Sequence, residues 1–169
     1  AAPIDEFGMA EAAHPDGSLI LFSHGSTGGL WKLGALSTRD GTLRHFGHII
    51  SNSGLQASLS PDGQWLAYVV GGGGTSTTCV EPFPPTGVKY EVPHRIEAAH
   101  PVWMPMGRSL MFKDYFALWQ VGVETTPSFR FGPARPVQRG GAVTSTASTR
   151  RNLDVIFGTD SFIAVVPPE

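Results

Sequence analysis

The tripeptide Pro61-Asp62-Gly63 is the feature that most constrains what this chain can fold into. Proline presets φ at the first central position of a type I turn, aspartate tolerates the second, and glycine accepts the left-handed residue that follows. Runs in which apolar residues alternate with others flank the turn at residues 55–59 and 64–70. The stretch therefore predicts a β-hairpin.

The same turn recurs along the chain. It returns in full at residues 15–17, with methionine in place of aspartate at 105–107, and in its weakest form at 157–159, so that successive turns begin 46, 44 and 52 residues apart. A period of about 40 to 50 residues with several strands per unit is typical of β-propeller blades. We predict an all-β, β-propeller-like fold with about three and a half four-stranded blades.

Each complete unit is expected to contain four short strands. Alternation and turn residues place these strands at residues 9–13, 18–23, 30–33 and 42–46; 55–59, 64–70, 77–82 and 88–92; 101–104, 109–113, 118–123 and 134–138; and 151–156 and 161–166. The units span about 9–50, 51–93 and 94–140, with a two-stranded partial unit at 141–169, in a single domain of residues 1–169. We expect residues 1–8 to form an arm able to complete the short last blade.

Composition narrows the classes of function. The formal net charge is -2 and the Lys and Arg residues do not cluster, which argues against a nucleic-acid interface. No run approaches the ~18 apolar residues of a transmembrane helix, and no basic, apolar leader is present, so an exported protein would already have lost its signal.

Cys79 is the only cysteine, which excludes an intrachain disulfide. The glycines at 71–74 lack the Gly-Lys-Ser/Thr of a phosphate loop and indicate a hairpin loop.

Three segments resemble a TolB-like β-propeller. They read Ser-Pro-Asp-Gly-Gln-Trp-Leu-Ala-Tyr at 60–68, Glu-Pro-Phe-Pro at 81–84, and Leu-Trp-Gln-Val at 118–121 with Pro-Ser-Phe at 127–129. Similar propellers occur at the C-terminal end of bacterial serine/threonine kinases and in periplasmic proteins, so the resemblance implies a periplasmic or other extracytoplasmic location. Such propellers have six or more blades, of which this chain supplies about half. The chain lacks the His-Arg-Asp and Asp-Phe-Gly signatures, so kinase activity is not implied.

Gln56, His94, Glu97 and His100 are the candidate ligand-binding residues. The last three lie in the connection entering the third unit, and in propellers such connections rim the central channel. Gln56 and His100 each stand five residues before the proline of their turn, so we expect them at equivalent places on neighbouring blades. Imidazole and carboxylate suit several divalent metals, which makes His94 and His100 weak candidates for metal ligands. The alternative is that these residues are solvated loop positions and a capped strand end.

Other polar and aromatic residues have simpler interpretations. His45 and His48 are expected to be solvated on an outer strand. Trp65 and Tyr68 should lie on opposite faces of their strand, with Leu66 sharing the Tyr68 face. An exposed Trp65 would suggest a stacking platform, whereas a packed one would belong to the core.

Two functions from different classes remain open. The first is a non-enzymatic binding or scaffold module without a cofactor, which holds a protein or peptide and assembles through its open blade edges as a homodimer. Two half-rings would make about seven blades, within the usual range for propellers. The alternative is a metal-assisted hydrolase or lyase that uses a divalent metal ion at a His/Glu site in the channel mouth.

Overall fold

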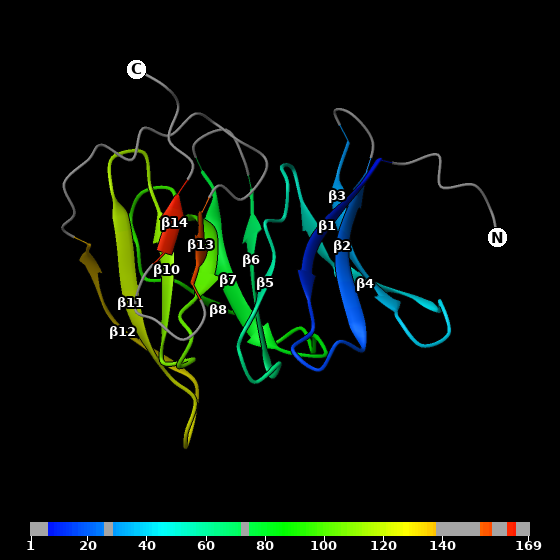
Figure 1. The fold of residues 1–169 in the computed structure, drawn as a ribbon. Helices are drawn as coiled ribbons and strands as arrows, with labels where there is room; N and C mark the ends of the chain where they lie inside the picture. Colours follow the sequence, from blue (N-terminus) through cyan, green and yellow to red (C-terminus); the bar gives the residue numbers. More distant parts are fainter. Residues whose placement is uncertain (1–6, 26–28, 72–74, 138–152, 157–161, 165–169) are drawn as a thin grey trace.

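The computed structural model describes residues 7–25, 29–71, 75–137, 153–156 and 162–164, and the regular elements in these ranges are all strands (Figure 1). Their bounds are β1 (Phe7–Ala13), β2 (Leu19–Gly25), β3 (Trp31–Ser37), β4 (Leu43–Ser51), β5 (Ser58–Leu59), β6 (Trp65–Val70), β7 (Thr77–Pro82), β8 (Tyr90–Glu91), β9 (Ala99–Trp103), β10 (Ser109–Lys113), β11 (Leu118–Glu124), β12 (Arg130–Pro136), β13 (Leu153–Val155) and β14 (Phe162–Ala164).

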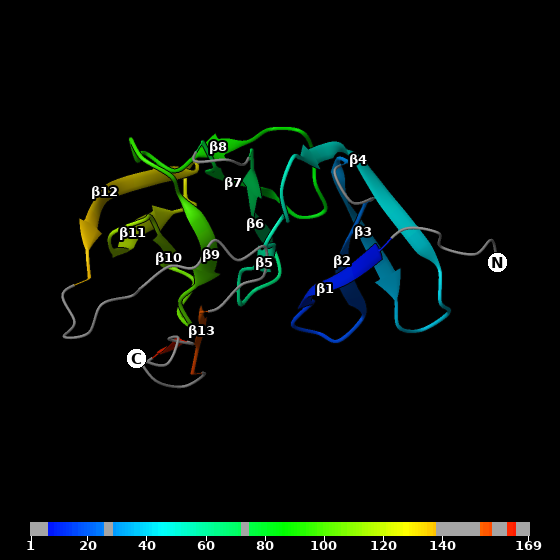
Figure 2. The ribbon, with the colours of Figure 1, turned by 90° about the horizontal axis from the view of Figure 1, so that it is seen from above.

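The strands form three four-stranded antiparallel sheets and one two-stranded sheet. We call the sheets β1–β4, β5–β8 and β9–β12 blades 1, 2 and 3, and within each the strands are hydrogen-bonded in sequence order. Figure 2 shows the blades side by side along an arc, with β1, β5, β9 and β13 on its inner side and β4, β8 and β12 on its outer side. This arrangement confirms the prediction of an all-β, partial propeller.

Several predicted strands have different lengths in the structure, and three of them matter for the blades. β5 and β8 contain only two residues each, and β12 begins at Arg130 rather than four residues later. β5 is short because Gln56 has a φ of 50°, which interrupts an extended strand. The turn predicted at 157–159 and most of the arm at 1–8 lie outside the described residues.

The three described Pro-x-Gly turns have one backbone geometry. Gly17, Gly63 and Gly107 have φ values of 73°, 70° and 67°. Each donates its N–H to the carbonyl oxygen three residues earlier, at 2.8 Å in all three turns. The turn predicted from sequence is therefore confirmed, and Met106 does not change it.

Strand β6 buries both of its faces. Leu66 and Tyr68, 0% and 2% exposed, belong to the core shared with blade 1, whereas Ala67, 0% exposed, belongs to the core shared with blade 3. Trp65 packs on the Ala67 side against the rings of Tyr90 and Phe129. The predicted assignment of faces is confirmed, and Trp65 is part of the packing between blades. Each fully buried Leu contributes roughly 1.5–3 kcal/mol, so blade 2 is stabilised from both sides.

Gly63→Ala should destabilise the fold more than Gly17→Ala. Both residues have positive φ, where an added Cβ costs about 1 kcal/mol. At Gly63 the new Cβ would also clash with His14 Nε2, whereas at Gly17 it would meet nothing within 4 Å. The His14 ring cannot easily move away because its Nδ1 lies 2.6 Å from Asp16 Oδ1. In thermal unfolding, Tm should fall by about 2–4 °C for each kcal/mol of unfolding free energy lost. The fall should be larger for Gly63→Ala than for Gly17→Ala.

The double variant His14→Ala/Gly63→Ala isolates the contact from the effect on the backbone. Relative to His14→Ala alone, it should lose about as much stability as Gly17→Ala does. Equal losses in the two glycine variants would contradict the close contact between the turn of blade 2 and blade 1.

Candidate functional site

Gln56 and His100 meet at the junction between the inner strands of blades 2 and 3. Both have positive φ, at 50° and 53°, and both are buried. The His100 N–H donates to Gln56 Oε1 at 2.7 Å. A left-handed conformation costs a residue with a side chain about 1–2 kcal/mol, which this buried hydrogen bond offsets. The structure thus places the two residues at equivalent positions and joins them.

Blades 1 and 2 are joined by a related contact. The Ala57 N–H donates to Glu11 Oε2 at 3.0 Å, again between a side chain of one inner strand and the backbone of the next. Measured from the turns, Ala57 corresponds to Pro101 of blade 3, which has no N–H, so in blade 3 the donor is the preceding residue, His100. These contacts align neighbouring blades along the inner side of the arc.

His94 contacts a different group, the buried carboxylate of Asp114. Its Nε2 is 3.1 Å from Asp114 Oδ2, and the two side chains are 9% and 2% exposed. Asp114 also accepts hydrogen bonds from the backbone N–H of Phe116 and Ala117 at 2.7 Å, and from Trp119 Nε1 at 2.8 Å. The carboxylate therefore organises the loop between β10 and β11. Asp114 was not predicted as a site residue, although an aspartate directly after a strand is a common signal for such a turn.

Burial would by itself raise the pKa of Asp114, but its hydrogen bonds outweigh burial. The N–H groups of Phe116 and Ala117, followed by the side chains of His94 and Trp119, lower the pKa of Asp114 below its usual 3.8. The carboxylate is thus stabilised in its charged form.

Glu97 interacts with two further side chains of blade 3, those of Tyr115 and Lys113. Its carboxylate interacts with the hydroxyl of Tyr115 and raises the pKa of that group. Lys113 is only 3% exposed, and burial lowers the pKa of its amine while the charge of Glu97 opposes this shift. The four predicted residues therefore belong to three separate contacts: Gln56 with His100, His94 with Asp114, and Glu97 with Lys113 and Tyr115.

Glu81 is a fully buried carboxylate that was not predicted as a site residue. It accepts hydrogen bonds from the Tyr68 hydroxyl at 2.8 Å and the Gly87 N–H at 2.9 Å, and His48 Nε2 of blade 1 lies 3.2 Å away. Burial, then the hydrogen bond to Glu81, raises the pKa of Tyr68. The signal in the sequence was a glutamate two residues after the core residue Cys79, on the same face of its strand.

The two histidines of β4 make different contacts. The side chain of His48 is 44% exposed, and its ring reaches from the outer strand of blade 1 to Glu81. His45 is exposed, and its Nδ1 lies 3.1 Å from His24 Nε2 on the free face of blade 1. His48 is therefore more than a solvated residue, because it links two blades.

The inner side of the arc contains a groove of about 330 Å³ at the end opposite Gln56 and His100. Its walls come from all four inner strands and their turns: Ala12, Ala13, Pro15, Ser58, Leu59, Ser60, Pro61, Val102, Trp103 and Asp154. The buried Nε1 of Trp103 has no hydrogen-bond partner among the described atoms. Sequence reasoning could not find this groove, because four units have to curve around one axis to form it.

Within the described ranges, no three His, Cys, Asp or Glu side chains come together in a way that could hold a metal ion. No helix in these ranges has the length and apolar character needed to span a membrane.

Asp114→Asn should destabilise the protein by about 2 kcal/mol, the usual scale for a hydrogen bond to a charged group. The Asn amide would either point its own N–H at the N–H of Trp119 or leave the backbone N–H donors of the loop unpaired. Because the folded-state pKa of Asp114 lies below 3.8, the difference between wild type and variant should be complete above about pH 4 and shrink as the pH falls below that value. Urea unfolding between pH 3 and pH 6 measures this.

Glu91→Gln is the matched control, because its side chain is 63% exposed. It should change the free energy of unfolding little at any of these pH values. A pH-independent loss in Asp114→Asn would contradict the assigned role of the charge.

Tyr68→Phe should cost about 1–3 kcal/mol, because it leaves the buried Glu81 with one donor fewer. Tyr90→Phe is the control, since the Tyr90 hydroxyl makes no hydrogen bond among the described residues while its ring packs in a comparable junction. Urea unfolding at pH 7 should separate the two variants. Equal stabilities would show that the hydrogen bond to Glu81 contributes nothing.

Comparison with known proteins places the fold. No family model matches the chain, and no curated protein matches its sequence. Among solved structures, TolB from Acinetobacter baumannii superposes with a TM-score of 0.53 at 19% identity, over 80% of this chain and 33% of that one. A structure described as the eukaryotic initiation factor gives a TM-score of 0.53 at 9% identity, over 80% of this chain and 34% of that one. The chain thus has a TolB-like propeller fold and spans about a third of the length of each of these proteins.

Proposed function

We propose that this TolB-like partial propeller is a non-enzymatic binding or scaffold module that associates through its uncovered blade faces with a second copy of itself. The main observation behind this proposal is that Ile20 on blade 1 is exposed. Counted from the turns, Ile20 corresponds to Leu66 in blade 2 and Leu110 in blade 3. Both leucines are 0% exposed, whereas Ile20 is 38% exposed.

The rest of the free face of blade 1 supports the same conclusion. Phe22 occupies the position of the buried Tyr68 and Phe112, and Leu43 on the same face is 46% exposed. Apolar side chains at positions that neighbouring blades bury elsewhere indicate a surface suited to association. A twofold axis would bring each blade 1 against the last unit of the other copy, and this pair of contacts would close the assembly.

The groove on the inner side of the arc supports a binding role for the module. Its volume of about 330 Å³ is at the lower end of the range for ligand sites, and its extended, mostly apolar walls suit a segment of a protein or peptide. The likeness to TolB and the resemblance of the second unit to periplasmic propellers support a location outside the cytoplasm. No contact among the described residues favours the metal-assisted hydrolase or lyase, so it is not proposed.

Multi-angle light scattering tests the assembly. We expect a concentration-dependent species with twice the 18.0 kDa mass of one chain. Ile20→Lys should weaken it at least tenfold, because the variant places a charge in the apolar contact. Val88→Lys is the control, since Val88 is 56% exposed but lies between β7 and β8, away from the free face of blade 1.

Two results would count against the assembly: an 18.0 kDa monomer at every concentration, or equal behaviour of Ile20→Lys and Val88→Lys.

A further inference from the structure

The outer half of the free face of blade 3 is polar where the matching part of blade 2 is apolar. In blade 2, the residues that face blade 3 at this level are Trp65, Val80 and Tyr90, of which Val80 is 0% exposed and the two aromatic rings pack against blade 3. Counted from the turns and the strand register, blade 3 has Ser109, Gln120 and Arg135 at the same three positions. This part of the face therefore lacks the apolar side chains with which blade 2 packs against blade 3.

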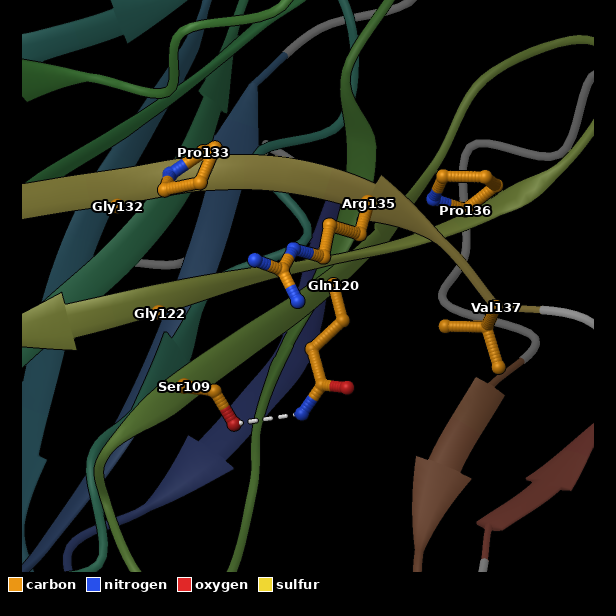
Figure 3. A pocket seen from close by; sticks show the side chains of 8 residues that line it. All are labelled: Ser109, Gln120, Gly122, Gly132, Pro133, Arg135, Pro136 and Val137. Carbon is orange, nitrogen blue, oxygen red and sulfur yellow. Dashed lines mark hydrogen bonds between the residues drawn. The ribbon is translucent and has the colours of Figure 1, made fainter.

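The polar residues line a groove of about 480 Å³ (Figure 3). Gln120 Nε2 donates to Ser109 Oγ at 2.9 Å, and Arg135 projects from β12 on the same side of the sheet. The lining residues are Ser109, Gln120, Gly122, Gly132, Pro133, Arg135, Pro136 and Val137.

Two glycines keep the groove open. A Cβ added at Gly122 would meet nothing within 4 Å, and one added at Gly132 would approach only the backbone of Gly122, at 3.8 Å. Backbone is therefore exposed across two neighbouring strands. An extended segment can approach this surface more closely than it could approach a sheet covered by side chains.

The charge of the groove is positive, and no described carboxylate compensates it. None of its lining residues is acidic. On the same strand, Arg130 pairs with Glu124, whereas Arg135 has no ion pair among the described residues. A guanidinium with free donors matches a carboxylate in both charge and geometry.

The surroundings restrict how a partner can lie. Pro133 and Pro136 in the edge strand β12 have no N–H, which disfavours strand addition along that edge. On the inner half of the face, β13 lies beside β9, and Val102 and Met111 are buried there. The open area is therefore the face over Gly122 and Gly132, beside the two-stranded unit.

We propose that this groove binds an extended, acidic segment of a partner protein, with a carboxylate on Arg135 and Gln120 and its backbone over Gly122 and Gly132. The inference rests on the binding role proposed above but uses a different surface from the free face of blade 1. Charge complementarity selects this occupant over a second copy, because the matching free face of blade 1 presents Lys32, His24 and His45 and no carboxylate at paired positions.

Fluorescence anisotropy with two synthetic peptides tests the proposal on the full chain. One is eight residues of alternating Glu and Thr, and the other has Lys in place of Glu. We expect the acidic peptide to bind, the basic one not to bind, and the affinity to fall as salt rises, because screening weakens the charge pair. Arg135→Gln should weaken binding at least tenfold, whereas Arg130→Gln, which removes the same charge from the same strand, should leave it within about twofold.

Gly122→Val supplies a second variant that should fold normally, since its side chain would enter open space in a strand. It should also weaken the acidic peptide at least tenfold by filling the groove. Circular dichroism and Tm equal to those of wild type would confirm that both variants are folded.

Failure to bind the acidic peptide, equal binding of the basic peptide, or unchanged affinity in Arg135→Gln would each overturn the proposal. Loss of self-association in Gly122→Val or Arg135→Gln, with no binding of the acidic peptide, would identify a second copy as the occupant instead. These outcomes can be told apart from those of the Ile20→Lys test. A dimer that does not bind the peptide would support the proposed self-association and contradict the acidic partner. A monomer that binds the peptide would support the acidic partner and contradict the self-association.

Discussion

The structure depends on one constraint, which is that the second strand of every blade presents large apolar side chains on a face that only the preceding blade can cover. Leu66 and Tyr68 are buried because blade 1 lies against them, and Leu110 and Phe112 because blade 2 does. A four-stranded sheet of this kind cannot be stable alone, since one blade leaves both faces in water. In blades 2 and 3 the preceding blade covers this apolar face, whereas no described blade covers the corresponding face of blade 1.

Polar groups at the blade junctions add hydrogen bonds to this apolar packing. Glu81 and His48 connect blades 1 and 2 on the outer side, while Gln56 and His100 connect blades 2 and 3 on the inner side. Each contact joins residues more than 30 positions apart, so each can form only after the blades have packed. Buried polar groups of this kind specify one arrangement of neighbours, because an alternative packing would leave them without partners. The two free ends of the arc then differ in chemistry: blade 1 presents Ile20 and Phe22, and blade 3 presents a cationic groove. They are accordingly suited to different occupants.

Much of the fold was predictable because its signals are local. The turn residues at 15–17, 61–63 and 105–107 determine hairpins through the φ preferences of proline and glycine, and the alternation in β6 assigns its two faces without any knowledge of the neighbours. The short β5 was not predictable, because the left-handed conformation of Gln56 accompanies a hydrogen bond to a residue 44 positions away. Glu81 and Asp114 were missed for a related reason. A carboxylate inside a strand or loop becomes significant only when the residues that surround it are known.

The sequence by itself determined the order of the strands, the three described Pro-x-Gly turns, the number of complete blades and the near equivalence of Gln56 and His100, since all of these follow from residue type and a regular spacing. Only the tertiary structure decided that the four candidate residues divide among three contacts, that a groove runs across four inner strands, and that Ser109, Gln120 and Arg135 gather on one free face. The physical reason is that backbone preference acts over a few residues, whereas burial, pairing and charge compensation depend on which distant blades come to lie side by side.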